Sequence, residues 1–437
     1  ALSQQLSQLS SQFSDQVLDA TNAWSLAIDE PKALAGLPQT ALDSAAQTAQ
    51  QRGQSGWLLT LEYPSFSAVM MYAEDANLRQ EMYQAYHTRA SDQGPQAGRY
   101  DNSAVIEEIL ALRHEQAQLL GFANYAEYSL ADKMAGSTDE VMDFLADLAK
   151  RAKPQAEREL AELRDFTAQS DGVEDLQPWD VTYYSERLRQ QRYNISQEEL
   201  RPHFPVDKVL SGLFALIGRL YGVSLHLIAE QETWHPDVGF YEIHDPDGQV
   251  CGQFYLDLYA RQHKRGGAWM DGCQSRLVSA YRQQNPIAYI TCNFTPPLGD
   301  KPALLTHDEV ETLFHEFGHG LHHLLTQVDY LSVAGINGVA WDAVELPSQF
   351  MENFCWQPPV LDMIAGHYAS DEPLPAALLE RLLAAKHFQA AMWMVRQLEF
   401  SLFDFRIHRE YDPTKGSQIE KVLQEVREQV AVIHPPQ

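Results

Sequence analysis

The chain has 437 residues, a length that corresponds to two or three domains if each holds about 150 residues. Its hydrophobic content of 45% and charged content of 21% lie near globular averages, which excludes a disordered, collagen-like or low-complexity protein. Its 32 basic and 60 acidic residues give a net charge of −28, which disfavours binding to nucleic acid or to anionic membranes.

Most of the chain shows the 3.6-residue periodicity of amphipathic helices. Helices are predicted over residues 101–120 and 138–165, where apolar residues recur at helical spacing between charged ones. A third, dense helical region is predicted over residues 374–407, beginning near Pro375. The chain is therefore expected to be mainly α.

Strand signals are few and short. Residues 249–258 and 286–294 are rich in β-branched and aromatic residues and are bounded by Gly, Asp and Pro. The second run alternates like a half-buried strand, so its free face could add an extended peptide, with a plain structural strand as the alternative. Residues 235–248 contain Gly and Pro and are expected to form a loop near a boundary between two lobes.

The cysteine pattern and the first residues bear on the compartment. The four cysteines are scattered without Cys-x-x-Cys spacing, which favours a reducing cytoplasmic compartment. The first residues lack the basic start and apolar core of a secretory signal, and no run of about 18 apolar residues is present. We expect no membrane-spanning helix.

Residues 315–319 read H-E-F-G-H, the H-E-x-x-H pattern of zinc peptidases. Thr306 and Glu309 fit a capping box, so a helix should begin near residue 307. On this helix the apolar residues form one stripe. His315 and His319 lie on the opposite face, roughly 6 Å apart, where they can share one metal ion with Glu316 beside them. A solvated polar helix face is the alternative.

A catalytic zinc site needs a third protein ligand. The next acidic residues are Asp342, Glu345 and Glu352, and Pro347 suits the first turn of a helix that Glu345 would directly precede. Glu345 and Asp342 both remain candidates for the third ligand at this point, Asp342 also as a plain loop or cap carboxylate.

Four glycine and histidine residues within and just after the motif need an explanation. Gly318 and Gly320 each cost about 1 kcal/mol in a helix interior, which either a close approach to the backbone or tight helix packing would explain. His322 lies about 10 Å further along the helix axis than His315, which is too far for it to bind the same ion. We interpret His322 and His323 as groups that face substrate or support the ligands, with a polar surface as the alternative.

These segments resemble a known family. The run L-L-T-H-D-E-V-E-T-L-F-H-E-F-G-H-G-L-H-H (304–323), followed by V-E-L-P-S-Q-F-M-E-N (344–353), is similar to the thimet oligopeptidase family of zinc peptidases. Supporting stretches include A-Y-I-T-C-N-F (288–294) and R-Q-L-E-F-S-L-F-D-F-R (396–406). The likeness extends through nearly the whole chain.

The resemblance implies roles for individual residues. It implies that His315, His319 and Glu345 bind one Zn²⁺ per chain and that Glu316 is the general base. The glycine-bearing loop before the third ligand corresponds to residues 334–339, whose Gly335 and Gly338 are expected to move or to contact substrate. An ordinary turn is the alternative for this loop.

The resemblance also implies the architecture and the activity. We expect a gluzincin-like, two-lobed helical fold with a deep substrate channel and a small β-sheet near the active site. Residues 1–240 would form one helical channel wall, and residues 241–437 would form the catalytic lobe. We expect a zinc endopeptidase that acts on short unfolded peptides and that is monomeric and cytoplasmic. A dipeptidyl carboxypeptidase of the same family and a catalytically silent peptide-binding fragment are the alternatives.

One family feature is missing from the sequence. A Tyr-rich segment of the kind G-Y-x-x-G-Y-Y, which helps to bind substrate and to polarise the scissile carbonyl, is not found before the chain stops at Gln437. We therefore expect a chain cut at both ends, and the residue that stabilises the oxyanion remains unnamed.

Overall fold

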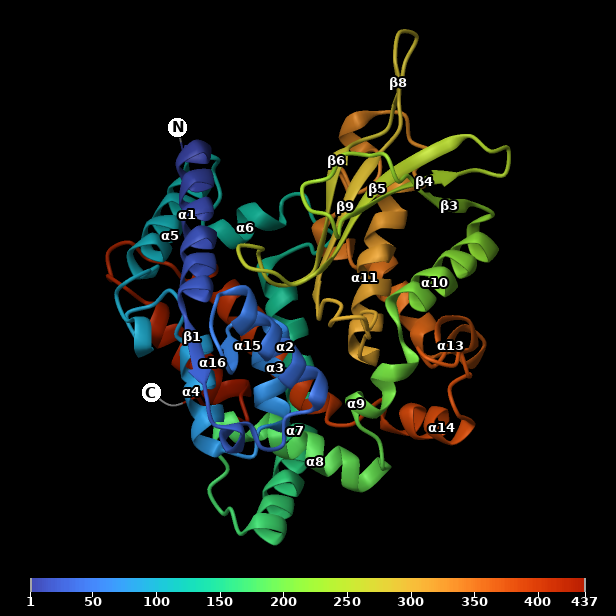
Figure 1. Cartoon of the computed structure of the whole chain (residues 1–437). Helices are drawn as coiled ribbons and strands as arrows, with labels where there is room; N and C mark the ends of the chain where they lie inside the picture. The colour runs from blue at the N-terminus through green and yellow to red at the C-terminus, as the bar shows by residue number, and fades with distance from the viewer. Residues whose placement is uncertain (1, 436–437) are drawn as a thin grey trace.

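The computed structural model describes residues 2–435 and is mainly helical, which confirms the predicted fold class (Figure 1). The helices are α1 (Leu2–Ala23), α2 (Gln39–Gln51), α3 (Tyr63–Tyr72), α4 (Ala76–His87), α5 (Ser103–Leu119), α6 (Tyr125–Leu130), α7 (Thr138–Asp171), α8 (Val181–Tyr193), α9 (Gln197–Leu200), α10 (Val206–Tyr221), α11 (His307–Leu324), α12 (Leu346–Glu352), α13 (Pro358–Ile364), α14 (Ala376–Ala385), α15 (Ala390–Arg409) and α16 (Ile419–Val430). The strands are β1 (Ser25–Ile28), β2 (Trp57–Thr60), β3 (Ser224–Leu227), β4 (Gly239–His244), β5 (Val250–Tyr259), β6 (Trp269–Gln274), β7 (Leu277–Val278), β8 (Gln283–Gln284) and β9 (Ile287–Phe294).

One five-stranded sheet organises the part of the chain that carries the zinc-peptidase motif. Its strand order is β3-β4-β5-β9-β6, with β5 and β9 parallel and the other neighbours antiparallel. The expectation that the 286–294 strand could add an extended peptide is wrong, because β9 is hydrogen-bonded on both sides, and the alternative of a plain structural strand holds. The strand at the edge of the sheet beside β9 is β6, which the sequence did not predict.

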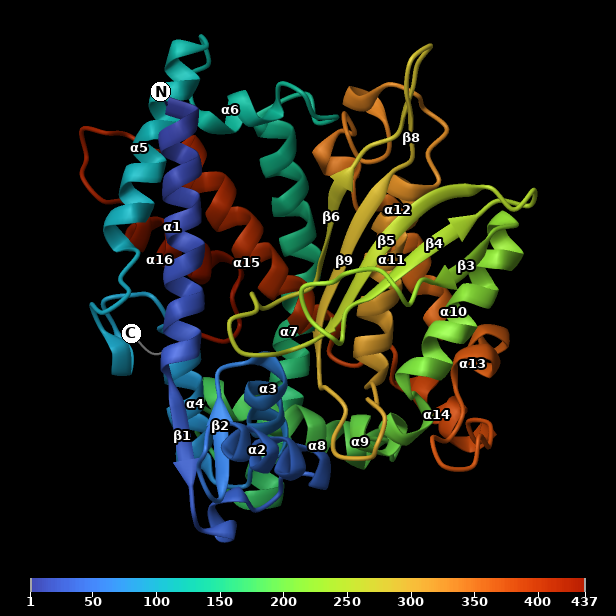
Figure 2. The same cartoon turned by 45° about the horizontal axis from the view of Figure 1, so that its top comes forward.

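Helix α11 lies against this sheet (Figures 1 and 2). The ring of Phe317 meets the ring of Phe254 on β5 edge-to-face, with 5.2 Å between centroids. The largest buried apolar cluster joins the sheet, α10, α11, α13 and α14, so the motif helix is fixed in a core rather than attached to a surface.

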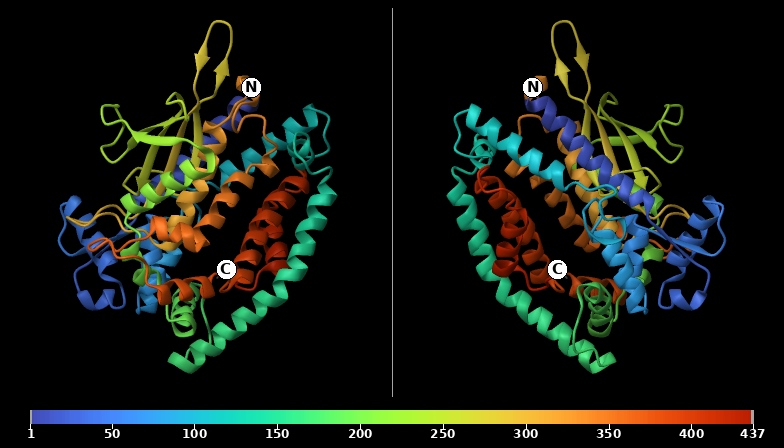
Figure 3. Two further views of the ribbon diagram at one scale, coloured as in Figure 1. Left: turned by 90° about the vertical axis from the view of Figure 1, so that its right-hand side faces the viewer. Right: turned by 90° about the vertical axis from the view of Figure 1, so that its left-hand side faces the viewer.

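The first and last helices lie on the other side of the molecule. Helices α7, α15 and α16 pack together, and residues of α5 join their apolar cluster (Figure 2). Helices from both sides of residue 240 thus share one cluster, and the lobe boundary at residue 240 stays a prediction. The β7–β8 hairpin projects beyond the rest of the molecule (Figure 3). Within residues 2–435 no helix has the length and apolar composition to cross a bilayer.

Most predicted elements are found near their expected bounds. The predictions for 101–120, 138–165, 249–258 and 286–294 are confirmed by α5, α7, β5 and β9. One prediction is wrong in part. The segment 235–248 contains β4 as well as loop, because β4 pairs with β3 and β5. The helical region predicted over 374–407 is confirmed by α14 and α15, which are separated by a break that ends at Gln389, whose φ is 53°.

Candidate metal centre

Helix α11 begins with the predicted capping box. The side chain of Thr306 accepts a hydrogen bond from the backbone N–H of Glu309, and the Glu309 carboxylate accepts one from the backbone N–H of Thr306. The apolar stripe from Val310 to Leu324 is buried, whereas His315 and His319 are partly exposed. The local sequence thus fixes where the helix starts and which face carries the two imidazoles.

Gly318 allows α12 to approach α11 closely. A Cβ atom on Gly318 would lie 2.5 Å from the Cα of Ser348 and 2.6 Å from the carbonyl oxygen of Pro347. Of the two explanations offered for this glycine, tight helix packing is the one that the structure supports. The Ser348 hydroxyl lies 2.8 Å from Oε2 of Glu345 and 2.9 Å from the Glu345 carbonyl oxygen. Close packing therefore places the carboxylate of Glu345 above the helix face that carries the histidines.

His315, His319 and Glu345 come together as a possible metal-binding group. Their ligand atoms all lie within 4.8 Å of one another. Oε2 of Glu345 lies 3.2 Å from Nε2 of His315 and 3.0 Å from Nε2 of His319. A tetrahedral zinc ion with bonds of about 2.0–2.1 Å separates its ligand atoms by roughly 3.3 Å, so this donor set fits the ion.

Glu352 orients His315. Its Oε1 lies 2.6 Å from Nδ1 of His315, which makes Nδ1 the protonated ring nitrogen and leaves the Nε2 lone pair directed at the group. Burial lowers the pKa of His319, which also favours a neutral imidazole with a free lone pair. The sequence placed Glu352 in the acidic cluster without a role. Its seven-residue separation from Glu345, two helical turns, is the signal that could have found it.

Glu316 lies beside the group and is 5% exposed. Its Oε2 has no hydrogen-bond partner among the residues that the structure describes. Burial raises the pKa of Glu316 to about 7. The charge of His315 and a hydrogen bond with the backbone of Met270 on β6 act to lower this pKa, whereas the negative charge of Glu345 raises it further. A carboxylate with this pKa can both accept and return a proton near neutral pH.

With this geometry established, the chain can be compared with known proteins. A model of peptidase family M3 matches residues 69–436, which is most of the chain. The chain belongs to peptidase family M3. This match confirms the family resemblance that the H-E-F-G-H and V-E-L-P-S-Q-F-M-E-N segments indicated.

Three relatives with which the chain aligns are peptidases by name. Oligopeptidase A of Salmonella typhimurium is 56% identical over 432 residues, which cover 99% of this chain and 64% of that relative, and oligopeptidase A of Escherichia coli gives the same values. Dipeptidyl carboxypeptidase of Salmonella typhimurium is 34% identical over 402 residues, covering 92% of this chain and 58% of that relative. The chain thus spans less than two thirds of the length of these relatives.

A solved structure supports the fold. A chain provisionally described as oligoendopeptidase F superposes with a TM-score of 0.50 at 17% identity, covering 90% of this chain and 56% of that chain. At this identity the likeness concerns the fold alone.

Asp342, the competing third ligand, lies elsewhere in this M3 chain. Its carboxylate accepts hydrogen bonds from the backbone N–H groups of Met134, at 2.9 Å, and Ala135, at 3.0 Å. These amide donors lower the pKa of Asp342. Among the described residues the three-membered group contains Glu345 and not Asp342. Asp342 therefore joins two segments that are distant in sequence.

The remaining predicted residues lie beyond the two imidazoles. His322 is partly exposed, and burial lowers its pKa. His323 is buried, and its Nε2 lies 2.9 Å from the carbonyl oxygen of Gln274 at the end of β6. Gly335 and Gly338 both have positive φ, 64° and 71°, and a Cβ on Gly335 would lie 2.5 Å from Nδ1 of His323. These glycines are thus required by the loop itself, and their contact with substrate stays a prediction.

Proposed function

We propose that this chain carries the catalytic centre of a zinc-dependent endopeptidase that hydrolyses short unfolded peptides. The observation that carries the proposal is the convergence of His315, His319 and Glu345 with Glu316 beside them. Three protein ligands with a fourth position left for water are the signature of catalytic zinc. When bound at this group, zinc lowers the pKa of a water molecule and polarises a substrate carbonyl.

The residues of the chain supply the remaining chemistry. Glu316 would accept the proton of the attacking water on its carboxylate and return it to the leaving amine. Glu352 would hold His315 in the tautomer that leaves Nε2 free to bind the metal. The strand β6 pairs with β9 only, among the described residues, so it presents a free edge beside Glu316. An extended peptide added to that edge would bind through its main chain, which suits a peptidase that accepts many sequences.

Two alternatives differ in what they predict. A dipeptidyl carboxypeptidase would release two residues from a free C-terminus, but the relative of that name is 34% identical, against 56% for oligopeptidase A. A catalytically silent binder would cleave nothing. We also propose zinc as the metal and a monomer as the working form. The cytoplasm is proposed as the compartment, because all four cysteines are free thiols.

The test is cleavage of an internally quenched peptide with both ends blocked. Zinc-loaded protein should cleave it internally, and a chelator should stop the reaction. Glu316→Gln should keep stoichiometric zinc and lose cleavage by about a hundredfold or more. Cleavage at the wild-type rate would remove Glu316 from the mechanism, and absence of cleavage in every condition would favour the silent binder.

A further inference from the structure

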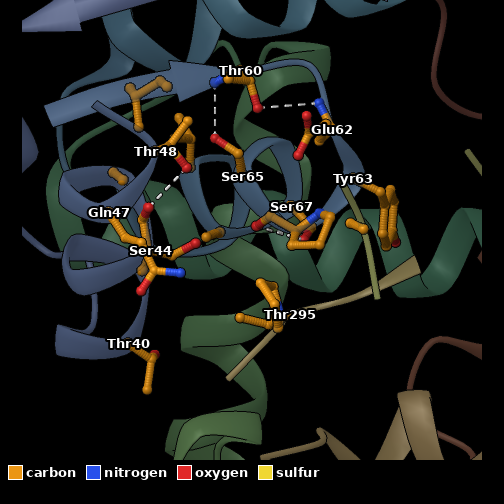
Figure 4. A pocket seen from close by; sticks show the side chains of 18 of the residues that line it. Thr40, Ser44, Gln47, Thr48, Thr60, Glu62, Tyr63, Ser65, Ser67 and Thr295 are labelled. Carbon is orange, nitrogen blue, oxygen red and sulfur yellow. Dashed lines mark hydrogen bonds between the residues drawn. The ribbon is translucent and has the colours of Figure 1, made fainter. Parts of the chain in front are cut away.

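A cavity of about 780 Å³ lies between α2, the β2–α3 segment and the start of α11. Figure 4 shows hydroxyl-bearing side chains from α2 and from the β2–α3 segment converging on it, with Thr295 on the opposite side. The labelled hydroxyl-bearing residues that line it are Thr40, Ser44, Thr48, Thr60, Tyr63, Ser65, Ser67 and Thr295. Nothing in the proposed mechanism uses this cavity.

The cavity borders the same face of α11 as the metal-binding group. Asp308 and Thr312 line the cavity, and at about 100° per residue their side chains fall within roughly 60° of those of His315 and His319. Along the helix axis Thr312 is about 5 Å and Asp308 about 10 Å from His315. An extended peptide covers about 3.3 Å per residue, so three or four residues reach from the metal group into the cavity.

The hydroxyl groups offer hydrogen-bond acceptors. Thr48 and Thr312 donate to the carbonyl oxygens of Ser44 and Asp308, each at 2.9 Å, and Ser67 is oriented toward the carbonyl of Pro64. Their protons are thereby engaged, so these oxygens can act toward a ligand only as hydrogen-bond acceptors. The start of α11 is occupied by its own capping box, so it does not attract an anion.

Part of the charge around the cavity is already neutralised. The Arg201 guanidinium pairs with Glu198 at 2.9 Å and with Glu309 at 3.5 Å. The Arg261 guanidinium pairs with the buried carboxylate of Asp257 at 2.7 Å. These two cations therefore do not contribute free positive charge to the cavity.

The charges that remain are mostly negative. With histidine counted as neutral, the other charged residues that line the cavity are Arg52 and the carboxylates of Glu62, Asp237 and Asp308. Glu62 comes from the N-terminus of α3 and Asp308 from the first turn of α11, and both line the cavity. A cavity with acceptor oxygens and excess carboxylate is complementary to a cation.

We propose that this cavity is a specificity subsite that binds a lysine or arginine side chain of the peptide, three or four residues from the cleaved bond. The proposal rests on the peptidase function above and adds to it a preference for a basic residue at one distance. The hydroxyl oxygens and the carboxylates of Glu62 and Asp308 would receive the ammonium or guanidinium group.

The experiment uses a series of blocked ten-residue peptides with one cleavable centre, in which a single lysine or glutamate is moved along the sequence on either side. Cleaved bonds are located by mass spectrometry and kcat/KM is measured for each peptide. We expect lysine to be favoured over glutamate by about fivefold at the third or fourth residue on one side of the bond, the range for partly exposed ion pairs. The Glu62→Gln, Asp308→Asn double variant should reduce that ratio to less than about twofold.

Controls separate this subsite from general charge. Glu108→Gln removes an exposed carboxylate of α5 that does not line the cavity, and it should keep the fivefold ratio. Equal use of lysine and glutamate at every position, or a ratio that survives the double variant, would overturn the subsite. If no peptide is cleaved, the proposed function fails. Anisotropy with labelled peptides then tests the cavity alone, where equal affinity for lysine and glutamate peptides overturns it and a preference lost in the double variant supports it.

Discussion

At the scale of single residues, the hydrogen bond on one ring nitrogen of a histidine sets how the other nitrogen is oriented toward a metal. His315 could rotate about its side-chain bonds if only Nε2 were engaged. The contact of 2.6 Å between its Nδ1 and Oε1 of Glu352 fixes both the ring orientation and the tautomer. The candidate ligands and their spacing could be predicted from the sequence, but this contact depends on how α12 lies on α11.

Replacing Glu352 by alanine should therefore weaken metal binding without removing a ligand. We expect the zinc affinity to fall by about 10–100-fold, because His315 loses its orienting partner. Competition with a chromogenic chelator measures the affinity. Glu311→Ala is a useful control, since its carboxylate bonds the Trp356 indole instead of a histidine. An unchanged affinity in Glu352→Ala would show that packing alone orients His315.

Glu316 gives a prediction about pH. Because its pKa is raised from 4.5 to about 7, the metal-free folded state binds its proton more tightly than the unfolded state does. This contribution to stability is present below about pH 4.5 and is lost as the pH rises to about 7, by at most about 3 kcal/mol. In metal-free protein, Glu316→Gln should thus raise Tm at pH 8 relative to wild type and leave it nearly unchanged at pH 4.5. Equal shifts at both pH values would contradict the buried carboxylate.

At the scale of elements, the sequence predicted those whose reason is local. The start of α11 follows from the capping box of Thr306 and Glu309, and its orientation follows from the apolar stripe. The strand β6 was missed because W-M-D-G-C-Q has no alternation, and its conformation depends on pairing with β9. The break at Gln389 was missed because no Gly or Pro marks it.

The close contact between α11 and α12 depends on Gly318, and a substitution at this position tests it. In Gly318→Ala the new Cβ meets the backbone of Pro347 and Ser348, so α12 and Glu345 must move away. We expect a loss of about 1–3 kcal/mol in unfolding free energy and a lower zinc affinity. Denaturant unfolding and chelator competition measure these quantities.

Gly320→Ala is the matched control for this variant. Its Cβ would meet only the end of the Ile290 side chain, at 2.8 Å, which can turn aside. The gain in helix propensity of about 1 kcal/mol should offset most of the cost. If the two variants lose metal equally, close approach at Gly318 is not what positions Glu345.

At the scale of the whole molecule, the sequence predicted the helical class and the family but not the long-range contacts. Residues separated by more than 200 positions meet at Asp342, where its carboxylate binds the amides of Met134 and Ala135 between α6 and α7. A carboxylate three residues before Glu345 was a reasonable ligand candidate by spacing. The three-dimensional fold is needed to show that Asp342 joins two distant segments of the chain instead.

Asp342→Ala should therefore release the segment between α6 and α7 while the metal stays bound. Without its acceptor the segment should open more often, and we expect trypsin to cut after Lys133 about fivefold faster under conditions where cleavage follows the open population. Mass spectrometry locates the cut, and the zinc content should remain that of wild type. Asp362→Ala, which removes an exposed carboxylate of α13, should leave the rate unchanged. Loss of zinc in Asp342→Ala would show that Asp342 is a metal ligand after all, because a residue that only joins two chain segments should not affect metal binding.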